Sequence, residues 1–481
     1  MNRTVYKSIV YSFAAQLVGV LSSICMSAFI PKVISVLNFS YWQLFVFYSS
    51  FIGLLHLGWI DGMYLRYGGK DLNQINRKSF SSQLVLYVTY HFLIVAIGLV
   101  IVAFVKSSEK IVFYFVLAYI PIKNIYSYFS MTLLSTGNIV RNSKCDILRK
   151  SFIIIAISVL LFCHTDFGYK TIIVLYVISE LLPFIPMLKS FNGIVYLRQL
   201  QSFRNAFKEA VDNINIGWSL TLSNIVSTLV LGVGRFFIKN EWDIITFGKV
   251  SLALSMSLFM IMLITQLSQT LFPYIRKSDD EKRKRVFSTL NGLLSIAFYL
   301  TFLIYFPIAL VVKLWLPQYT DSVYYMSILC GICLFEGKMS MLCTTYLKCL
   351  NRQRALLRIN IVTVLVSLAL AILFSVIFHN LTMIIYSMII AVAFRCVISI
   401  LFLQKCMNIE NDYKIIIQDL TMVLIFLSFQ SLMASWLSFL SITIVLSILF
   451  YHRRQDIVSY IKIFKNDNLT QTNERMASNR G

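Results

Sequence analysis

Nine ionisable side chains within or beside long apolar segments are the residues of this sequence best suited to do chemistry. Five are cations within the apolar segments, Lys123, Arg235, Lys249, Lys338 and Arg395, and the other four are Asp61, Arg66, Glu180 and Glu336. A charge near the centre of a bilayer costs on the order of 3 kcal/mol on insertion scales, so it generally faces a polar cavity or an opposite charge. We therefore predict that the five basic residues bind an anionic ligand and that the other four serve ion coupling or gating.

Lys123, Glu336 and Lys338 lie near the middle of their apolar segments, where a charge is most costly. Shifting the sequence by 213 residues places Lys123 on Glu336, so two related segments carry opposite charges at one depth. Two interpretations are open: a structural ion pair between them, or separate roles in lining a cavity. Glu336 and Lys338 are two residues apart, about 200° around a helix, and cannot face the same partner.

The sequence contains no recognisable motif for enzymatic catalysis or for cofactor binding. Cys330-Gly-Ile-Cys333 has the spacing of a zinc or redox pair, but no second pair of ligands accompanies it, so we predict a packing role. The lack of a glycine-rich phosphate loop argues against ATP hydrolysis by this chain. The sequence therefore predicts a protein that is not an enzyme and that has no metal site and no cofactor.

The composition decides what kind of element positions these charges. Of 481 residues, 58% are apolar and only 13% are charged, against about 25% charged residues in an average soluble domain. The mean hydropathy is +0.75. These figures exclude a disordered chain and a small disulfide scaffold. They indicate an integral membrane protein.

The apolar runs are continuous over about 20 residues, which predicts α-helices, because alternation over about 10 residues would be expected of a membrane barrel. We count fourteen transmembrane helices. They cover 8–30, 41–60, 83–105, 111–136, 151–163, 171–188, 214–238, 244–272, 290–312, 322–347, 359–378, 381–403, 416–433 and 436–451.

The net charge of +22 would suggest nucleic-acid binding in a soluble protein, but here the basic residues follow the predicted topology. Of the 43 Lys and Arg residues, 32 fall at the N-terminus, in the even-numbered loops or in the C-terminal tail, and six fall in the odd-numbered loops. Cytoplasmic loops of membrane proteins retain Lys and Arg. We therefore expect a multi-pass protein with both termini in the cytoplasm and no nucleic-acid partner.

The helix order predicts an all-α polytopic fold with two pseudo-symmetric six-helix lobes and two extra C-terminal helices, because offsets of 208 and 213 residues align parts of the two halves. The predicted parts are an N-terminal lobe (1–188), a cytoplasmic amphipathic linker (189–213), a C-terminal lobe (214–403), two further transmembrane helices (404–451) and a basic cytoplasmic tail (452–481).

Short motifs at the ends of three predicted helices resemble those of a known family. They are Leu-Gly-Trp-Ile-Asp-Gly at 57–62, Leu-Arg-Tyr-Gly-Gly at 65–69, Gly-Val-Gly-Arg-Phe-Phe at 232–237 and Leu-Phe-Pro-Tyr at 271–274. Together with the basic fourteen-helix pattern, they resemble the bacterial polysaccharide repeat-unit flippases, the O-antigen and capsule translocases of the MATE-like MOP exporter superfamily. Gly234 stands where that family usually has an acidic residue.

This resemblance implies two six-helix lobes around a cationic cavity and an undecaprenyl-pyrophosphate-linked oligosaccharide as substrate. The expected function is translocation of repeat units from the cytoplasmic to the outer face of the bacterial inner membrane, for O-antigen, lipopolysaccharide or capsule assembly. Alternating access would be coupled to an ion gradient. Expected partners are the lipid-linked glycan, membrane lipids, a polysaccharide polymerase and a chain-length regulator.

Three other functions compete with this one. A cation-coupled drug exporter of the same fold would favour acidic over basic groups in its cavity. A membrane glycan polymerase would need larger outer loops than the short ones found here. A flippase for the peptidoglycan precursor would have the same chemistry, and the sequence does not separate it from the first reading.

Overall fold

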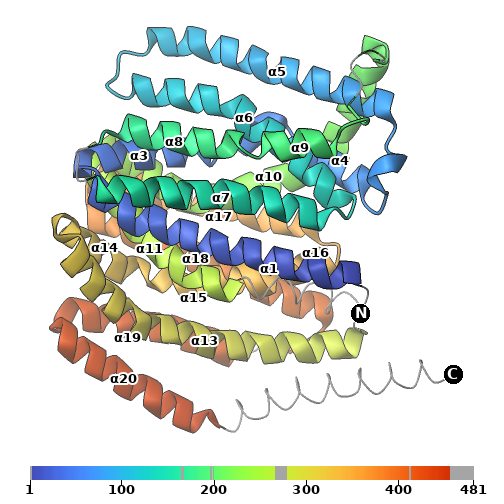
Figure 1. Cartoon of the computed structure of the whole chain (residues 1–481). Helices are drawn as coiled ribbons and strands as arrows, with labels where there is room; N and C mark the ends of the chain where they lie inside the picture. Colours follow the sequence, from blue (N-terminus) through green and yellow to red (C-terminus); the bar gives the residue numbers. More distant parts are fainter. Residues whose placement is uncertain are drawn as a thin grey trace. The chain divides into compact units, whose positions relative to one another are not determined.

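The computed structural model describes residues 3–163, 167–195, 198, 200–265, 279–410 and 413–454, and within these ranges every regular element is a helix (Figure 1). The first α-helices are α1 (Arg3–Ile24), α2 (Ile30–Val33), α3 (Val36–Ser49), α4 (Trp59–Tyr67), α5 (Arg77–Phe104), α6 (Lys110–Ser135), α7 (Ile139–Phe162), α8 (Tyr169–Leu181), α9 (Phe184–Ser190), α10 (Phe203–Glu241) and α11 (Ile244–Thr265). The later ones are α13 (Asp280–Trp315), α14 (Thr320–Leu329), α15 (Gly331–Lys338), α16 (Thr344–Cys349), α17 (Gln353–Ile372), α18 (Leu381–Met407), α19 (Tyr413–Leu432) and α20 (Ser435–His452). The motif at 271–274 and nearly all of the predicted tail lie outside the described residues.

The described chain contains eleven helices long and apolar enough to cross a membrane, and thirteen spans if two bent helix pairs are included. The fold class is therefore confirmed as an all-α polytopic membrane protein. The predicted count of fourteen is not confirmed. The difference is the fifth predicted helix, 151–163. It is the second half of α7, whose first half carries charged residues such as Asp146, Arg149 and Lys150.

Contacts between helices divide the chain into two compact units, which we describe separately. The first comprises Met1–Phe259, Val312–Tyr325 and Gln353–Ala391, and the second comprises Met260–Val311, Met326–Arg352 and Val392–Gly481. The division falls inside several helices, including α11 and α18. The six-helix lobes and their boundaries at 188 and 213 stay a prediction.

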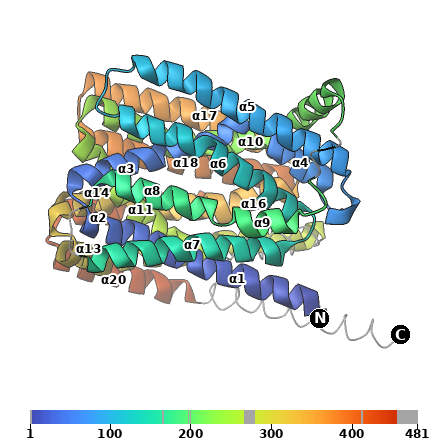
Figure 2. The ribbon, with the colours of Figure 1, turned by 45° about the horizontal axis from the view of Figure 1, so that its top comes forward.

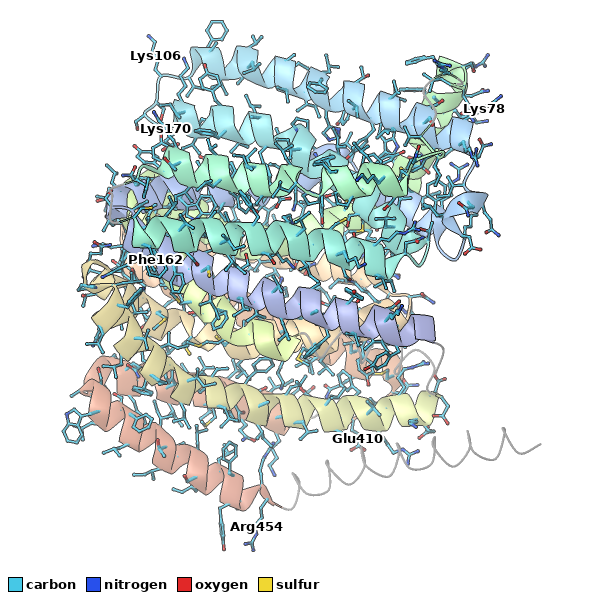
Figure 3. The ribbon with its side chains drawn as sticks, in the orientation of Figure 1. Lys78, Lys106, Phe162, Lys170, Glu410 and Arg454 are labelled. Atoms are coloured by element: carbon cyan, nitrogen blue, oxygen red, sulfur yellow. The ribbon has the colours of Figure 1, made fainter. Side chains whose placement is uncertain are left out.

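In the first unit, α1 packs along α7, α5 packs along α6, and α10 packs against both α4 and α17 (Figures 1 and 2). Lys106 and Lys170 lie at one end of these helices, and Lys78 lies at the other end (Figure 3). The sequence assigns the first two residues to odd-numbered loops and the third to an even-numbered loop. The alternation of helix directions around these loops therefore follows the predicted order.

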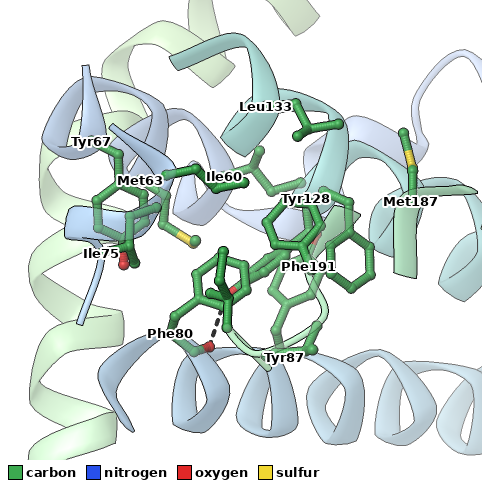
Figure 4. Close-up of a cluster of buried hydrophobic side chains, with 14 of the residues drawn as sticks. Ile60, Met63, Tyr67, Ile75, Phe80, Tyr87, Tyr128, Leu133, Met187 and Phe191 are labelled. Carbon is green, nitrogen blue, oxygen red and sulfur yellow. Dashed lines mark hydrogen bonds between the residues drawn. The ribbon is translucent and has the colours of Figure 1, made fainter. Parts of the chain in front are cut away.

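An aromatic core joins α4, α5 and α6 to the segment after α9 (Figure 4). Phe80 stacks on Phe191 with ring centroids 5.5 Å apart, and the Tyr128 hydroxyl donates a hydrogen bond to the Phe80 carbonyl at 3.1 Å. Both aromatic side chains of that hydrogen-bonded pair are fully buried. The core fixes one end of three helices whose apolar faces would not by themselves define a register.

The second predicted span is broken rather than straight. The 3-10 turn η2 (Ile52–His56) follows α3, and the chain bends by 60° before α4. Leu57 and Gly58 both have positive φ, at 53° and 89°. A Cβ on Gly58 would lie 2.5 Å from the backbone nitrogen of Trp218, so the break and the contact with α10 both require glycine here.

Residues 203–213, predicted as part of a separate amphipathic linker, form the first turns of α10. Phe203 and Phe207 are 72% and 54% exposed, whereas Ala206 and Ala210 are buried against the unit. In Figure 1 these turns lie beside the end of α5 and run across its direction. The segment continues directly into the membrane-spanning part of α10, and the cytoplasmic linker at 189–213 stays a prediction.

Aromatic contacts join helices of the second unit, and part of a second broken span lies within it. Phe302 of α13 stacks on Phe426 of α19 with centroids 4.6 Å apart. The chain bends by 50° between α14 and the helices α15 to α16, with a π-helical turn, η5 (Met339–Cys343), following α15. Cys330 and Cys333 lie at this bend and are fully buried among apolar side chains.

Candidate functional site

The first unit contains a cavity of about 390 Å³ between α3, α6 and α8. One face of each helix contributes to it, and α3, α6 and α8 all pack on one another. The lining residues are Phe45, Val46, Ser49, Ser50, Gly53, His56, Tyr119, Lys123, Asn124, Ser127 and Tyr176. Three aromatic rings, five hydroxyl groups, one amide, one imidazole and one ammonium therefore share one intramembrane space.

Among the described residues that line this cavity, Lys123 is the one Lys, Arg, Asp or Glu side chain. Within the described ranges, no carboxylate oxygen lies within 4.0 Å of its ammonium group. The centroid of the Tyr126 ring lies 6.0 Å from Nζ. An unpaired ammonium at this depth is costly, so the cavity is suited to bind an anion.

Aromatic rings form one wall of the cavity. Phe45 contacts Tyr119 at 5.6 Å between centroids, and Tyr119 contacts Tyr176 at 5.7 Å. Trp42 packs behind Phe45 and Tyr176, at 5.8 Å and 5.4 Å. Phenolic and phenyl faces of this kind bind the apolar faces of ring-shaped ligands, and the tyrosine hydroxyls add polar contacts.

Asn124 faces the cavity and is held from behind by His91 of α5. Asn124 Nδ2 lies 2.8 Å from His91 Nε2, and His91 Nδ1 lies 2.9 Å from the Tyr87 carbonyl oxygen. His91 is 0% exposed and Asn124 is 1% exposed. The histidine was not among the predicted site residues.

Two of the other predicted substrate-binding residues lie in the first unit but do not line this cavity. Arg235 lies over the rings of Phe47 and Phe247, with its guanidinium carbon 4.9 and 5.3 Å from their centroids, and donates to Ser251 at 3.0 Å. Lys249 forms a 2.5 Å ion pair with Asp321.

The remaining two predicted cations lie in the second unit, and both have carboxylate partners. Lys338 is fully buried and contacts Asp419 at 2.5 Å and Ser295 at 2.7 Å. Arg395 is buried and donates to Glu336. Glu336 is therefore paired within its own unit, and the alternating directions expected for Glu336 and Lys338 are observed.

Asp61 and Arg66, predicted as gating residues, both connect α4 to α10. Asp61 accepts a hydrogen bond from the Thr221 hydroxyl. Arg66 Nη1 lies 3.4 Å from Asn213 Oδ1, and its Nη2 lies 3.9 Å from Glu209. These contacts lie beside the glycine contact between the two helices and are separate from the Lys123 cavity.

Glu180 is fully buried and belongs to a network between α7 and α8. Its Oε1 accepts from Arg149, and Arg149 also donates to Asp146 at 2.7 Å. Lys150 contacts the other oxygen of Asp146 at 2.6 Å. Two cations thus balance two carboxylates in this cluster, which gives Glu180 a structural partner that sequence reasoning did not identify.

Sequence reasoning also missed Asp419 and Asp321, the partners of Lys338 and Lys249. Asp419 could have been found, because it is an acidic residue inside the thirteenth apolar segment. Asp321 lies in a short loop, where an acidic residue carries no such signal. In the described residues, no three His, Cys, Asp or Glu side chains are grouped as a metal site would require.

Comparisons with known proteins define the class of this fold. No protein-family model matches the sequence, and no curated protein sequence matches it. Solved structures match along most of the chain, and they are polytopic transporters of the MOP superfamily. The chain therefore has the MOP transporter fold.

The individual matches are distant in sequence. The chain is similar to the lipid II flippase MurJ in an inward closed conformation, with a TM-score of 0.62, 15% identity, and coverage of 92% of this chain and 98% of that one. An inward-facing multidrug resistance MATE family transporter gives a TM-score of 0.58 at 14% identity, covering 82% and 94%. A MATE protein in the straight conformation gives 0.53 at 12% identity, covering 84% and 95%.

Proposed function

We propose that this protein is a flippase that carries undecaprenyl-pyrophosphate-linked oligosaccharide repeat units across the bacterial inner membrane. The observation that carries the proposal is the cavity of Lys123, which combines an ammonium lacking a carboxylate neighbour within 4.0 Å in the described chain with aromatic faces and hydroxyl groups. A pyrophosphate requires the positive charge, and a sugar ring requires the aromatic and polar wall.

Lys123 is the substrate-binding residue in this proposal. Lys249, Lys338 and Arg395 each have a carboxylate partner, so binding an anion there would require breaking an ion pair. Arg235 has aromatic faces on two sides instead. Asp61, Glu180 and Glu336 are proposed to carry the coupling ion. The process served is O-antigen or capsule assembly. Both termini are proposed to lie in the cytoplasm.

Two alternatives remain relevant because of the structural matches. A drug exporter such as the MATE proteins would bind cationic compounds more readily next to a carboxylate than next to Lys123. The lipid II named for MurJ also consists of a glycan on a polyisoprenoid pyrophosphate, so the same cavity suits it. Peptidoglycan-precursor transport is therefore the second candidate.

The test compares Lys123→Ala, Lys123→Arg and a control, Lys110→Ala, at the start of the same helix. In a strain lacking related flippases, Lys123→Ala should abolish surface polysaccharide at normal protein level, Lys123→Arg should retain part of it, and the control should retain all of it. Normal polysaccharide with Lys123→Ala would contradict the proposal. Restoration of growth in cells depleted of their peptidoglycan-precursor flippase would favour the second candidate.

A further inference from the structure

Asn124 and His91 together determine which hydrogen-bonding group the cavity presents next to Lys123. A backbone carbonyl oxygen can only accept a hydrogen bond. His91 Nδ1, 2.9 Å from the Tyr87 carbonyl, must therefore carry the proton. In a neutral imidazole the other nitrogen, Nε2, is then an acceptor.

The neutral form of His91 follows from its surroundings. The ring is completely buried inside a membrane-spanning helix. Across the described part of the chain, no carboxylate oxygen lies within 4.0 Å of it. An imidazolium would thus be an uncompensated charge in an apolar environment, which is costly.

The orientation of the Asn124 amide is fixed as a consequence. Because His91 Nε2 accepts, Asn124 must turn its Nδ2 towards the histidine, at 2.8 Å. Its carbonyl oxygen, Oδ1, is then available to the cavity that Asn124 lines. Without His91 the amide could rotate and present either end.

We infer that His91 is a positioning residue that makes Asn124 an obligatory hydrogen-bond acceptor, so that the cavity selects a ligand with a hydroxyl or amide N–H donor next to its anionic group. This inference rests on the proposed function and adds a specificity to it. A pyrophosphate alone offers only acceptors at neutral pH, whereas the first sugar of a lipid-linked glycan offers donors within reach of both Lys123 and Asn124.

The experiment measures binding of two probes to the purified full-length protein in lipid nanodiscs: undecaprenyl pyrophosphate, and the same lipid carrying one N-acetylglucosamine. The ratio of the two dissociation constants is the readout. We expect the wild-type protein to prefer the glycosylated lipid by about tenfold, the value of one hydrogen bond of 1.4 kcal/mol. The control Lys110→Ala should show the same ratio.

Variants of His91 separate positioning from mere packing. In His91→Gln the side-chain carbonyl can still accept from Asn124, so the preference should persist. In His91→Leu nothing holds the Asn124 amide, so either end can face the cavity and the preference should fall. Asn124→Leu should remove it as well, with His91 intact.

The outcomes distinguish the two proposals. Equal binding of both probes by the wild-type protein, or an undiminished preference in a folded His91→Leu or Asn124→Leu variant, would overturn the positioning role while leaving the flippase proposal intact. Two results together would contradict the flippase proposal itself. They are failure of the wild-type protein to bind either probe, and normal surface polysaccharide in cells that carry Lys123→Ala.

Discussion

Lys338 Nζ lies 2.5 Å from Asp419 Oδ2, and both side chains are buried inside the second unit. Ser295 and Tyr299 complete the arrangement, since Tyr299 donates to the other carboxylate oxygen at 2.6 Å. Every oxygen of the carboxylate thus has a partner. Two charges are retained in a membrane-spanning bundle because each satisfies the other.

This relationship predicts the effect of removing one charge or both. Lys338→Met should leave an unpaired carboxylate and destabilise the protein by roughly 3–5 kcal/mol, by analogy with buried pairs in soluble proteins. The double variant Lys338→Met with Asp419→Leu should recover most of that loss, because no charge is then left buried without an opposite charge. Melting temperature in detergent gives the measurement, and Lys405→Met, an exposed lysine of α18, is the control. Equal losses in the single and double variants would argue against the pairing.

The contact between α4 and α10 predicts that Gly62 tolerates no side chain. A Cβ there would lie 1.8 Å from the Asn213 carbonyl oxygen, and backbone cannot move aside as a side-chain tip can. Gly62→Ala should therefore cost about 3 kcal/mol or more and reduce the amount of folded protein in membranes.

Gly69 is the matched control for this prediction. It has a φ of +82°, and a Cβ there would meet nothing within 4 Å. Gly69→Ala should cost only about 1 kcal/mol, the backbone strain of a left-handed residue. If both alanine variants were expressed equally well, the close approach of the two helices would be refuted.

Asp61 allows its structural and coupling roles to be separated. Asp61→Asn keeps an oxygen that can accept from Thr221, so the helix contact and the protein level should be preserved. An amide cannot carry a proton on and off, so transport driven by a proton gradient should be lost. The measurement is transport of the lipid-linked oligosaccharide across the membrane of proteoliposomes that carry an imposed pH gradient. Full transport by Asp61→Asn would assign the residue to structure alone.

The predicted topology is tested by alkaline phosphatase fusions, since the enzyme is active only outside the cytoplasm. Lys170 lies at the same end of the helices as Lys106 (Figure 3), and both belong to loops predicted to lie outside the cytoplasm. A fusion after Lys170 should therefore be active. A fusion after Arg285 should be inactive, because six basic residues surround this position between 276 and 285. The opposite pair of results would invalidate the helix order.

The positions of the spans could be predicted from sequence because long apolar runs have few alternatives in a bilayer. Thirteen of the fourteen predicted segments correspond to spans, once the two bent pairs are counted. The bends themselves were not predicted. The break at Leu57–Gly58 depends on how closely α4 approaches α10, and a hydropathy pattern contains no information on that approach.

The candidate site could be predicted only in part. Lys123 is conspicuous as a mid-segment cation, and it does line a cavity. Its companion Asn124 carries no charge, so nothing in the local pattern marks it, and His91 is visible in the sequence only as a lone histidine in an apolar run. The sequence also does not indicate which cations have a carboxylate partner, because an ion pair such as Lys338 with Asp419 joins residues 81 positions apart.

The joint between α4 and α10 has a consequence for biogenesis. Asp61 and Thr221 are separated by 160 residues, so α4 leaves the ribosome long before its partner exists. Until α10 is made, the glycine side of α4 has no helix to pack against and the Asp61 carboxylate has no hydrogen-bond donor from Thr221. Both groups are unfavourable in contact with lipid. We expect α4 to stay at the translocation machinery or at the membrane surface until α10 is inserted, which makes the completion of α10 the step that commits the nascent first unit to its fold.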